Sequence, residues 1–393
     1  MPPYPLPPQI NPSFANNGNV DYWNGQSATR PPEIAFWSFS IQRELTKSTV
    51  FEADYNATAG MHLQSGLMNV NQVPMSVVNQ LISQYGATNA INLLRAGITS
   101  SAAVADHIAA PYANFLDPTV QHSQTVNQAL RPYPQYLTVD TSQSGGDKSG
   151  HSTYNALVLK LDHRYTSGLT LGWSYVFPKL LTDSDTYYAN AGFAQDNGNL
   201  RVEKSIGAYD QTHVVKFNTL YDLPFGKGRR WLTHGFANQA AGGWRVSAIQ
   251  VYSSGYPLAV VRNAPLPIFN GNNRPYITSY DWRAAYSGNF DPAVDLYLNP
   301  NAFPAQPASI LGNATRYNPT VRAFPNLNEN VSLGKSFFFT ERLHLDFRAE
   351  AFNLLNRVVF GSPGNNINST TFGVVSSQAN SPRQMQMALK LYW

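Results

Sequence analysis

Charged side chains alternate along residues 343–351, LHLDFRAEA, and bring Asp346 and Glu350 within four positions of each other. Two carboxylates at this spacing could act as the acid and base of a hydrolase. On a strand, however, residues two positions apart lie on the same face, so Asp346, Arg348 and Glu350 would form one charged row. Opposite charges in such a row pair with each other and with neighbouring strands. We therefore interpret the row as a structural ladder, and interpret Lys160 and Asp162 in the same way.

Other patterns that bear on chemistry are weak. GKGRR at residues 226–230 lacks the GxxxxGK spacing followed by Ser or Thr, so we interpret it as a basic turn. Asp183, Asp185 and Asp196 lie in a polar stretch without the EF-hand pattern, which leaves a calcium site and a solvated loop as alternatives. The eight histidines form no HExxH motif, and no Gly-x-Ser-x-Gly elbow is present. The sequence predicts no catalytic residue, no cofactor and no metal site, and therefore no enzyme.

Aromatic residues gather in the polar stretches between the periodic segments. They are Tyr187, Tyr188, Tyr276, Tyr280 and Trp282. Flat rings of this kind stack on sugars and grip peptides, so we consider them possible ligand contacts. The alternative is that they hold long loops together.

In the segments that carry these residues, apolar and polar residues alternate with the period of two that is typical of β-strands. In residues 383–393, RQMQMALKLYW, one face holds Met385, Met387, Leu389, Leu391 and Trp393, and the other holds Gln384, Gln386, Ala388, Lys390 and Tyr392. An apolar face opposite a polar face is typical of transmembrane β-strands, with lipid on one side and water on the other. The same alternation predicts strands at 34–45, 49–57, 154–165, 169–177, 212–223, 244–253, 328–338 and 343–351. The pattern at 244–253 is less regular, and we expect a bulge there.

The connections between these strands alternate in length. Along the chain they are long, tight, long, tight, long, moderate, long, tight and long, which places all the long loops at one end of an up-and-down sheet. The loop at about 61–150 contains a helical pattern, with Val77, Val78, Leu81, Ile82 and Tyr85 at helical spacing and Gly86 as the expected stop. A soluble sandwich has no reason to sort its loops in this way. The pattern therefore predicts extracellular loops at one end and periplasmic turns at the other.

Composition agrees with a β-rich chain. Charged residues make up 13% of the 393 residues and aromatic residues another 13%, with 27 glycines and 27 prolines. The formal net charge is +4 and the sequence contains no basic tract, which argues against nucleic-acid binding. The chain has no cysteine, no run of 18 apolar residues, and no basic and apolar start typical of a signal peptide.

Several phrases resemble the barrel of TonB-dependent outer-membrane receptors, and most of all the Oar-like branch. They are PEIAFWSFSIQREL, STVFEADYNATAGMHL, YNALVLKLDHRYTSGLTLGWSYVFPKLLTDSD, LYDLPFGKGRRWL, AGGWRVSAIQVYSSGYPL, LGKSFFFTERLHLDFRAEAFNLLNRVVFG and SPRQMQMALKLYW. The resemblance implies a barrel of roughly 22 strands around a plug that the TonB complex pulls. It also implies a barrel-assembly signal at Met387, Leu389, Leu391 and Trp393, read by the outer-membrane barrel-assembly machinery.

We therefore expect an all-β protein, a partial up-and-down antiparallel transmembrane β-barrel of about nine strands of a larger barrel. Its long extracellular loops would include one that is partly helical. Residues 1–393 would be the C-terminal portion of a receptor barrel in the bacterial outer membrane, with the plug and N-terminal strands absent. Lys160, Asp162, Asp346, Arg348, Glu350 and Lys390 would face the lumen. Such a fragment, not active alone, would serve uptake of an oligosaccharide, peptide or siderophore.

A soluble or surface-attached β-rich carbohydrate-binding module is the alternative. The two hypotheses differ in where Leu157, Leu159 and Leu161 and the apolar face of 383–393 lie. A sandwich would bury these side chains against a second sheet, whereas a barrel would expose them to lipid.

Overall fold

Nine long antiparallel strands form one sheet, in which neighbours along the chain are also neighbours in space. The computed structural model describes residues 19–21, 29–118, 122–140, 147–166, 168–183, 185, 194–262, 274–285, 289–305, 311–340 and 342–393. Within these residues the nine strands are β2 Glu33–Thr46, β3 Thr49–Leu63, β5 Gly150–Thr166, β6 Leu169–Thr182, β8 Val214–Asp222, β9 Trp244–Ser253, β10 Asn326–Phe338, β11 His344–Phe352 and β12 Gln384–Tyr392. Each corresponds to a predicted strand, and the all-β antiparallel fold is confirmed.

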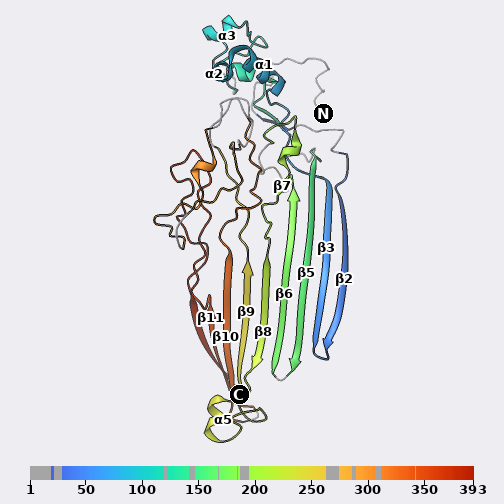
Figure 1. The fold of residues 1–393 in the computed structure, drawn as a ribbon, viewed down its shortest axis with the longest axis vertical. Helices are drawn as coiled ribbons and strands as arrows, with labels where there is room; N and C mark the ends of the chain where they lie inside the picture. Colours follow the sequence, from blue (N-terminus) through green and yellow to red (C-terminus); the bar gives the residue numbers. More distant parts are fainter. Residues whose placement is uncertain are drawn as a thin grey trace, which may run out of the picture.

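The two outermost strands, β2 and β12, each pair with a single neighbour in the described part of the chain. The sheet is therefore open. Both edge strands run from the long-loop end to the opposite end, as expected for an odd number of alternating strands (Figure 1).

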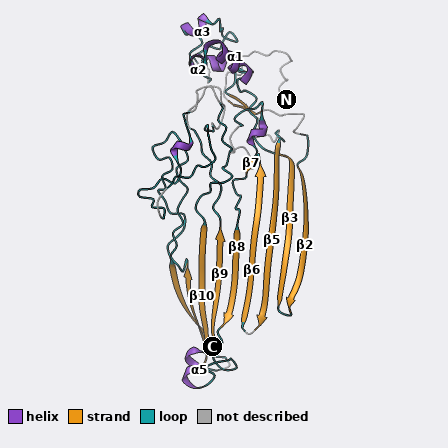
Figure 2. Ribbon diagram, viewed as in Figure 1, coloured by secondary structure: helices purple, strands orange, loops and turns teal. Residues whose placement is uncertain are grey.

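The loops are sorted by length, as the sequence predicts. Figure 1 shows the long connections at one end of the sheet, with helices α1, α2 and α3 beyond them, and the tight turns at the other end beside the C-terminus. We call these the long-loop end and the short-turn end. The moderate connection at the short-turn end contains a helix that the sequence analysis did not predict, α5 Gly235–Ala241 (Figure 2).

The predicted helix in the first long loop is present as α1 Met75–Tyr85. It ends at Gly86, whose φ of 77° is accessible to glycine and whose N–H donates to the Ile82 carbonyl. The remaining short helices are α2 Ala87–Arg95, α3 Ser101–Ala105, α4 Val126–Ala129 and the 3₁₀ turns η2 Leu200–Glu203 and η3 Pro300–Ala302. None of the described helices is long and apolar enough to cross a membrane.

Three short strands were not predicted. β1 Asn19–Asp21 pairs in parallel with β4 Thr138–Asp140, and β7 Ser205–Ile206 extends the sheet beside β6. The bulge expected at 244–253 is wrong, because β9 pairs with β8 and β10 in continuous register. The irregular pattern has another cause: Gln250 lies on the apolar face, in register with Phe217 and Glu329.

The hydrophobic core lies in the loops rather than in the sheet. One buried cluster includes Trp282, Tyr297 and Leu298, and a second joins α1, α2 and α4. The sheet, in contrast, leaves its apolar side chains open, with Met387 72% exposed and Leu157 40% exposed. In the described part of the chain no second sheet covers them, so the sandwich that the carbohydrate-binding alternative requires is not present.

Candidate functional site

The two faces of the sheet differ in chemistry. The register places Lys160 in line with Ser174 and Lys216, and it places Asp346 in line with Ser336 and Lys390. We call this side the polar face and the side that carries Met385 to Leu391 the apolar face. All six residues of the predicted ladder share the polar face: Lys160, Asp162, Asp346, Arg348, Glu350 and Lys390. That this face lines a lumen stays a prediction.

On strands β2, β3 and β5 the polar face carries one charged cluster. Lys160 Nζ donates to Glu52 Oε1 at 2.7 Å and to Asp54 Oδ2 at 3.0 Å, and Ser40 donates to the other oxygen of Asp54. The lysine therefore bridges two carboxylates on the adjacent strand. The sequence predicted Lys160 as a ladder residue but gave no indication of its partners, since they lie more than 100 positions away.

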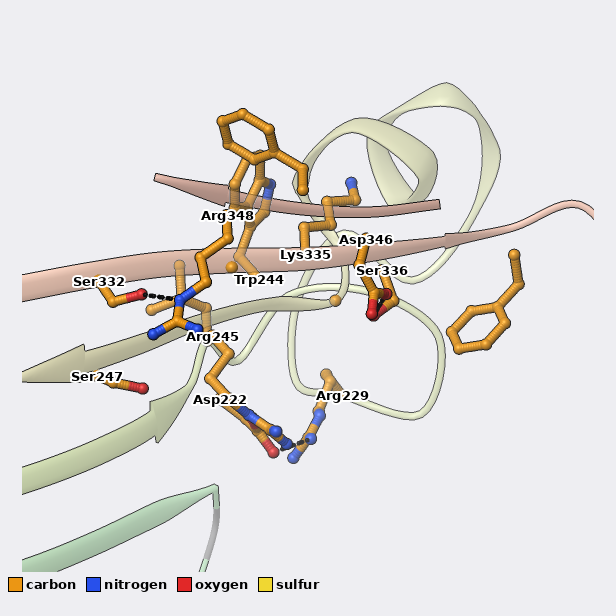
Figure 3. Close-up of a pocket in the computed structure, with 15 residues that line it drawn as sticks. Asp222, Arg229, Trp244, Arg245, Ser247, Ser332, Lys335, Ser336, Asp346 and Arg348 are labelled. Carbon is orange, nitrogen blue, oxygen red and sulfur yellow. Dashed lines mark hydrogen bonds and ion pairs between the residues drawn. The ribbon is translucent and has the colours of Figure 1, made fainter. Parts of the chain in front are cut away.

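A second cluster lies at the short-turn end of the polar face and lines a cavity of about 540 Å³ (Figure 3). We call it the short-turn cavity. Asp222, Arg245, Gly334 and Arg348 occupy one row across β8, β9, β10 and β11. Asp222 accepts from Arg245 Nε at 2.6 Å and from Arg229 Nη2 at 3.1 Å. Because Gly334 has no side chain, the row is open between the two arginines of β9 and β11.

The rows next to this one are also polar. Ser336 donates to Asp346 at 2.6 Å, Arg348 Nε is 3.4 Å from Ser332 Oγ, and Glu350 pairs with Arg348 and accepts from Gln386. Three arginines and two aspartates thus border the polar-face side of the cavity, which leaves it with an excess of positive charge. Such a wall can hold an acidic or polar protein segment. Arg229 comes from GKGRR, which the sequence identified only as a basic turn.

Lys335 lines the same cavity from the apolar face. Its Nζ donates to the Gln239 carbonyl and, at 2.9 Å, to the Ala240 carbonyl, at the C-terminal end of α5. A cation is favourable at this end of a helix because the last carbonyls have no partner within the helix. Trp244 Nε1 donates to the Ala240 carbonyl at 3.0 Å. The two side chains therefore fix α5 to the base of the sheet.

At the long-loop end, the predicted aromatic ligand contacts divide into three groups. Trp282 is fully buried, stacked on Tyr280 with ring centroids 6.1 Å apart, and its Nε1 donates to the Ser279 carbonyl at 3.0 Å. It is therefore a core residue of the loops and not a surface for ligand. Tyr280 is exposed and Tyr276 is half-buried, whereas Tyr187 and Tyr188 lie outside the described residues.

Three arginines of the loop between β9 and β10 bind three acids of the loop between β6 and β8. Arg274 pairs with Glu203 at 2.6 Å, Arg316 with Asp185 at 2.5 Å, and Arg322 with Asp210 at 2.6 Å. All six side chains are largely buried. Asp183 binds His151, so it and Asp185 are both engaged by basic groups, and no three metal-ligating side chains converge in the described part of the chain.

Comparison with known proteins places the chain among membrane barrels. The family model of an outer membrane beta barrel domain matches residues 1–386. Among solved structures, the outer membrane transporter YddB from Escherichia coli is 10% identical with a TM-score of 0.42, over 95% of this chain and 34% of that one. The ferripyoverdine receptor of Pseudomonas aeruginosa is 8% identical with a TM-score of 0.35, over 95% and 28%.

The toluene transporter TodX of Pseudomonas putida is 9% identical with a TM-score of 0.22, over 91% of this chain and 60% of that one. The chain thus spans less than two thirds of each of these three structures. No curated protein sequence matches it.

Proposed function

Since the chain belongs to the outer membrane beta barrel domain family and lies in the bacterial outer membrane, we propose that it is the C-terminal part of the barrel of a TonB-dependent receptor of the Oar-like branch. The observation that carries this proposal is an antiparallel sheet of nine long strands and the short β7, with one polar face, one apolar face and, in the described part of the chain, two open edges. Unpaired backbone groups at an edge are costly in lipid, at several kcal/mol each. The edges therefore call for further strands of a larger barrel.

In this proposal each region has one role. The apolar face contacts lipid, and the polar face, including the ladder of Lys160, Asp162, Asp346, Arg348, Glu350 and Lys390, faces a plug in the lumen. The short-turn cavity offers arginines to acidic or polar groups of that plug, at the end nearest the periplasm. Movement of the plug by the TonB complex would supply the energy for uptake.

The long-loop end is the proposed entry for ligand. The buried arginine–carboxylate pairs hold two loops in a fixed arrangement, and a fixed arrangement lowers the entropic cost of binding. Of the predicted aromatic contacts that the structure describes, Tyr280 is exposed and Tyr276 is half-buried. The proposed ligand is large, namely an oligosaccharide, a peptide or a siderophore. Met387, Leu389, Leu391 and Trp393 would form the signal that the barrel-assembly machinery reads.

The experiment that tests this proposal begins with the reading frame upstream of Met1. We expect it to encode a plug and further alternating strands. Co-expression of that upstream region with the 393-residue chain should give a complex that co-purifies from outer membranes. Combined Arg245→Gln and Arg348→Gln substitutions should weaken retention of the plug. An upstream region without a plug or strands would contradict the proposal.

A further inference from the structure

A strongly basic cavity lies at the long-loop end of the sheet, on the side of the apolar face. It has a volume of about 900 Å³, and we call it the rim cavity. Its basic lining residues are Arg30, His62, Lys148, His151, Arg201 and Lys204. They come from the segments that precede β2, end β3, begin β5 and connect β6 to β8, so the cavity gathers cations from four separate parts of the chain.

Little negative charge offsets these cations. Asp183 is the one acid among the described lining residues, and it already accepts from the His151 backbone N–H at 2.6 Å and contacts His151 Nδ1 at 3.0 Å. Arg30, Arg201 and Lys204 are exposed, and the ion pairs found among the described residues do not include them or Lys148. Outside the described residues the sequence holds a single acid, Glu341.

The register fixes which way the cavity faces. Thr153 pairs with Ala59 and lies on the same face as Leu157, the exposed apolar side of β5. His151 lies six positions before Leu157, which corresponds to about 20 Å along a strand. Strands in such barrels tilt by about 40°, and the outer apolar band is about 25 Å tall. The rim cavity therefore lies just beyond the apolar band, at the level of lipid headgroups rather than acyl chains.

The local backbone opens the site. The pairing of β3 with β5 shifts register between Gly60 and Leu63, and His62 between them has a φ of 54°. Such irregularities at a barrel rim bend the strand and redirect side chains. Below the cavity, Phe39, Tyr55 and Leu157 form an exposed apolar row across β2, β3 and β5.

We propose that the rim cavity binds the phosphate groups of a phosphorylated lipid in the outer leaflet of the outer membrane. Arginine and lysine are the side chains that bind phosphate most strongly, and the cavity holds two of each. The acyl chains lie along the apolar row of β2, β3 and β5, so one lipid satisfies both the charge above and the apolar surface below. This inference rests on the outer-membrane location and is independent of the proposed transport activity.

The test measures binding of diphosphoryl lipid A to the full chain, purified from outer membranes in nonionic detergent. An Arg201→Gln/Lys204→Gln variant should bind at least tenfold more weakly, since each basic group near an anionic lipid contributes about fivefold. The matched control, Lys227→Gln/Arg230→Gln, removes the same two residue types at the short-turn end and should bind within twofold of the unaltered chain. Enzymatically dephosphorylated lipid A should also bind at least tenfold more weakly.

Three results would overturn the proposal. They are equal affinity for the phosphorylated and dephosphorylated lipids, unaltered affinity of the rim variant, and displacement of the lipid by inorganic phosphate at equal concentration. The last result would identify a free-phosphate site. Heat-modifiable electrophoretic mobility checks the fold of the rim variant. If that variant misfolds, Arg30→Gln/Lys148→Gln, which removes cations from two other segments, must give the same tenfold loss.

Discussion

The loops and the sheet of this protein are stabilised in opposite ways. The loops contain fully buried aromatic residues and buried arginine–carboxylate pairs, as the interior of a globular protein does. The sheet has side chains exposed on both faces, and the pairs on its polar face remain accessible, with Arg348 63% exposed at its side chain. In the loops the chain buries its own apolar side chains. The apolar face of the sheet, in contrast, stays exposed on the chain and can be covered only by something outside it.

We infer from this difference that the two regions meet different solvents. A sheet exposed on both faces in water would leave large apolar patches, which soluble monomers avoid. Lipid against the apolar face removes that problem without any further protein. The loops, in contrast, lie beyond the membrane and must complete their own core.

The largest expected effect comes from breaking a buried pair in the loops. Glu203→Ala leaves Arg274 as a buried charge without its carboxylate, which should lower local stability by about 3–5 kcal/mol. Hydrogen exchange of residues 274–285 and 314–322 measures the loss. Glu350→Ala, which removes the partner of the exposed Arg348, is the matched control and should cost at most about 1 kcal/mol. Equal effects at the two sites would remove the contrast between loops and sheet.

The next effect concerns the two faces of one strand. Leu159→Arg places a charge on the apolar face of β5 and should lower folding stability in lipid vesicles by about 2–4 kcal/mol. Val158→Arg, one position away, points to the polar face and should have a much smaller effect. Urea titration of the two variants in vesicles gives the comparison. A larger loss from Val158→Arg would mean that the faces have been assigned in reverse.

A smaller effect is expected in the short-turn cavity. Asp222→Asn removes the charge that Arg229 and Arg245 share, and both arginines are partly exposed. The expected loss is at most about 1 kcal/mol and should shrink at high salt, because salt screens exposed pairs. Hydrogen exchange of residues 222–245 at low and high ionic strength measures it. A loss that salt does not change would indicate a buried network like the one in the loops.

The smallest effect is a titration in the first long loop. Tyr85 donates a hydrogen bond of 2.6 Å to Asp106, which raises the pKa of the Tyr85 phenol above its ordinary value of 10.0. The phenol should therefore keep its proton to higher pH than a free tyrosine. The difference in phenolate absorbance between the unaltered chain and Tyr85→Phe isolates this group. Asp106→Asn should bring the midpoint down, and an unchanged midpoint would show that the hydrogen bond does not hold the proton.

The sheet could be predicted from the sequence because the pattern that identifies a strand lies within the strand itself. Alternation of apolar and polar residues identifies each strand and assigns Lys160, Arg348 and Lys390 to one face. Strand ends were predicted less well. β3 continues to Leu63 although Thr58 and Gly60 weaken the alternation, and β6 continues to Thr182 although Pro178 interrupts it. α5 was missed because it has only seven residues, with Phe236 as its one large apolar side chain, and no side chain caps its start.

The contacts that stabilise the loops join residues far apart in the sequence, and the periodicity of apolar residues cannot reveal them. Arg316 and Asp185 are 131 positions apart, and Arg274 and Glu203 are 71 apart, so no spacing in the sequence pairs them. Trp282 is an aromatic residue of a type that often contacts ligands, but residues from distant segments bury it. The rim cavity was missed for the same reason, since its two arginines and two lysines come from three segments that are far apart along the chain.

The most direct test of the account is a cysteine scan of β12, residues 384–392, in a chain that has no cysteine of its own. Each position in turn would carry an environment-sensitive fluorophore in lipid vesicles. We predict that a lipid-soluble quencher acts at 385, 387, 389 and 391, and that a water-soluble quencher acts at 384, 386, 388 and 390. Quenching without this alternation, or in the opposite phase, would contradict the assignment of the apolar face to lipid.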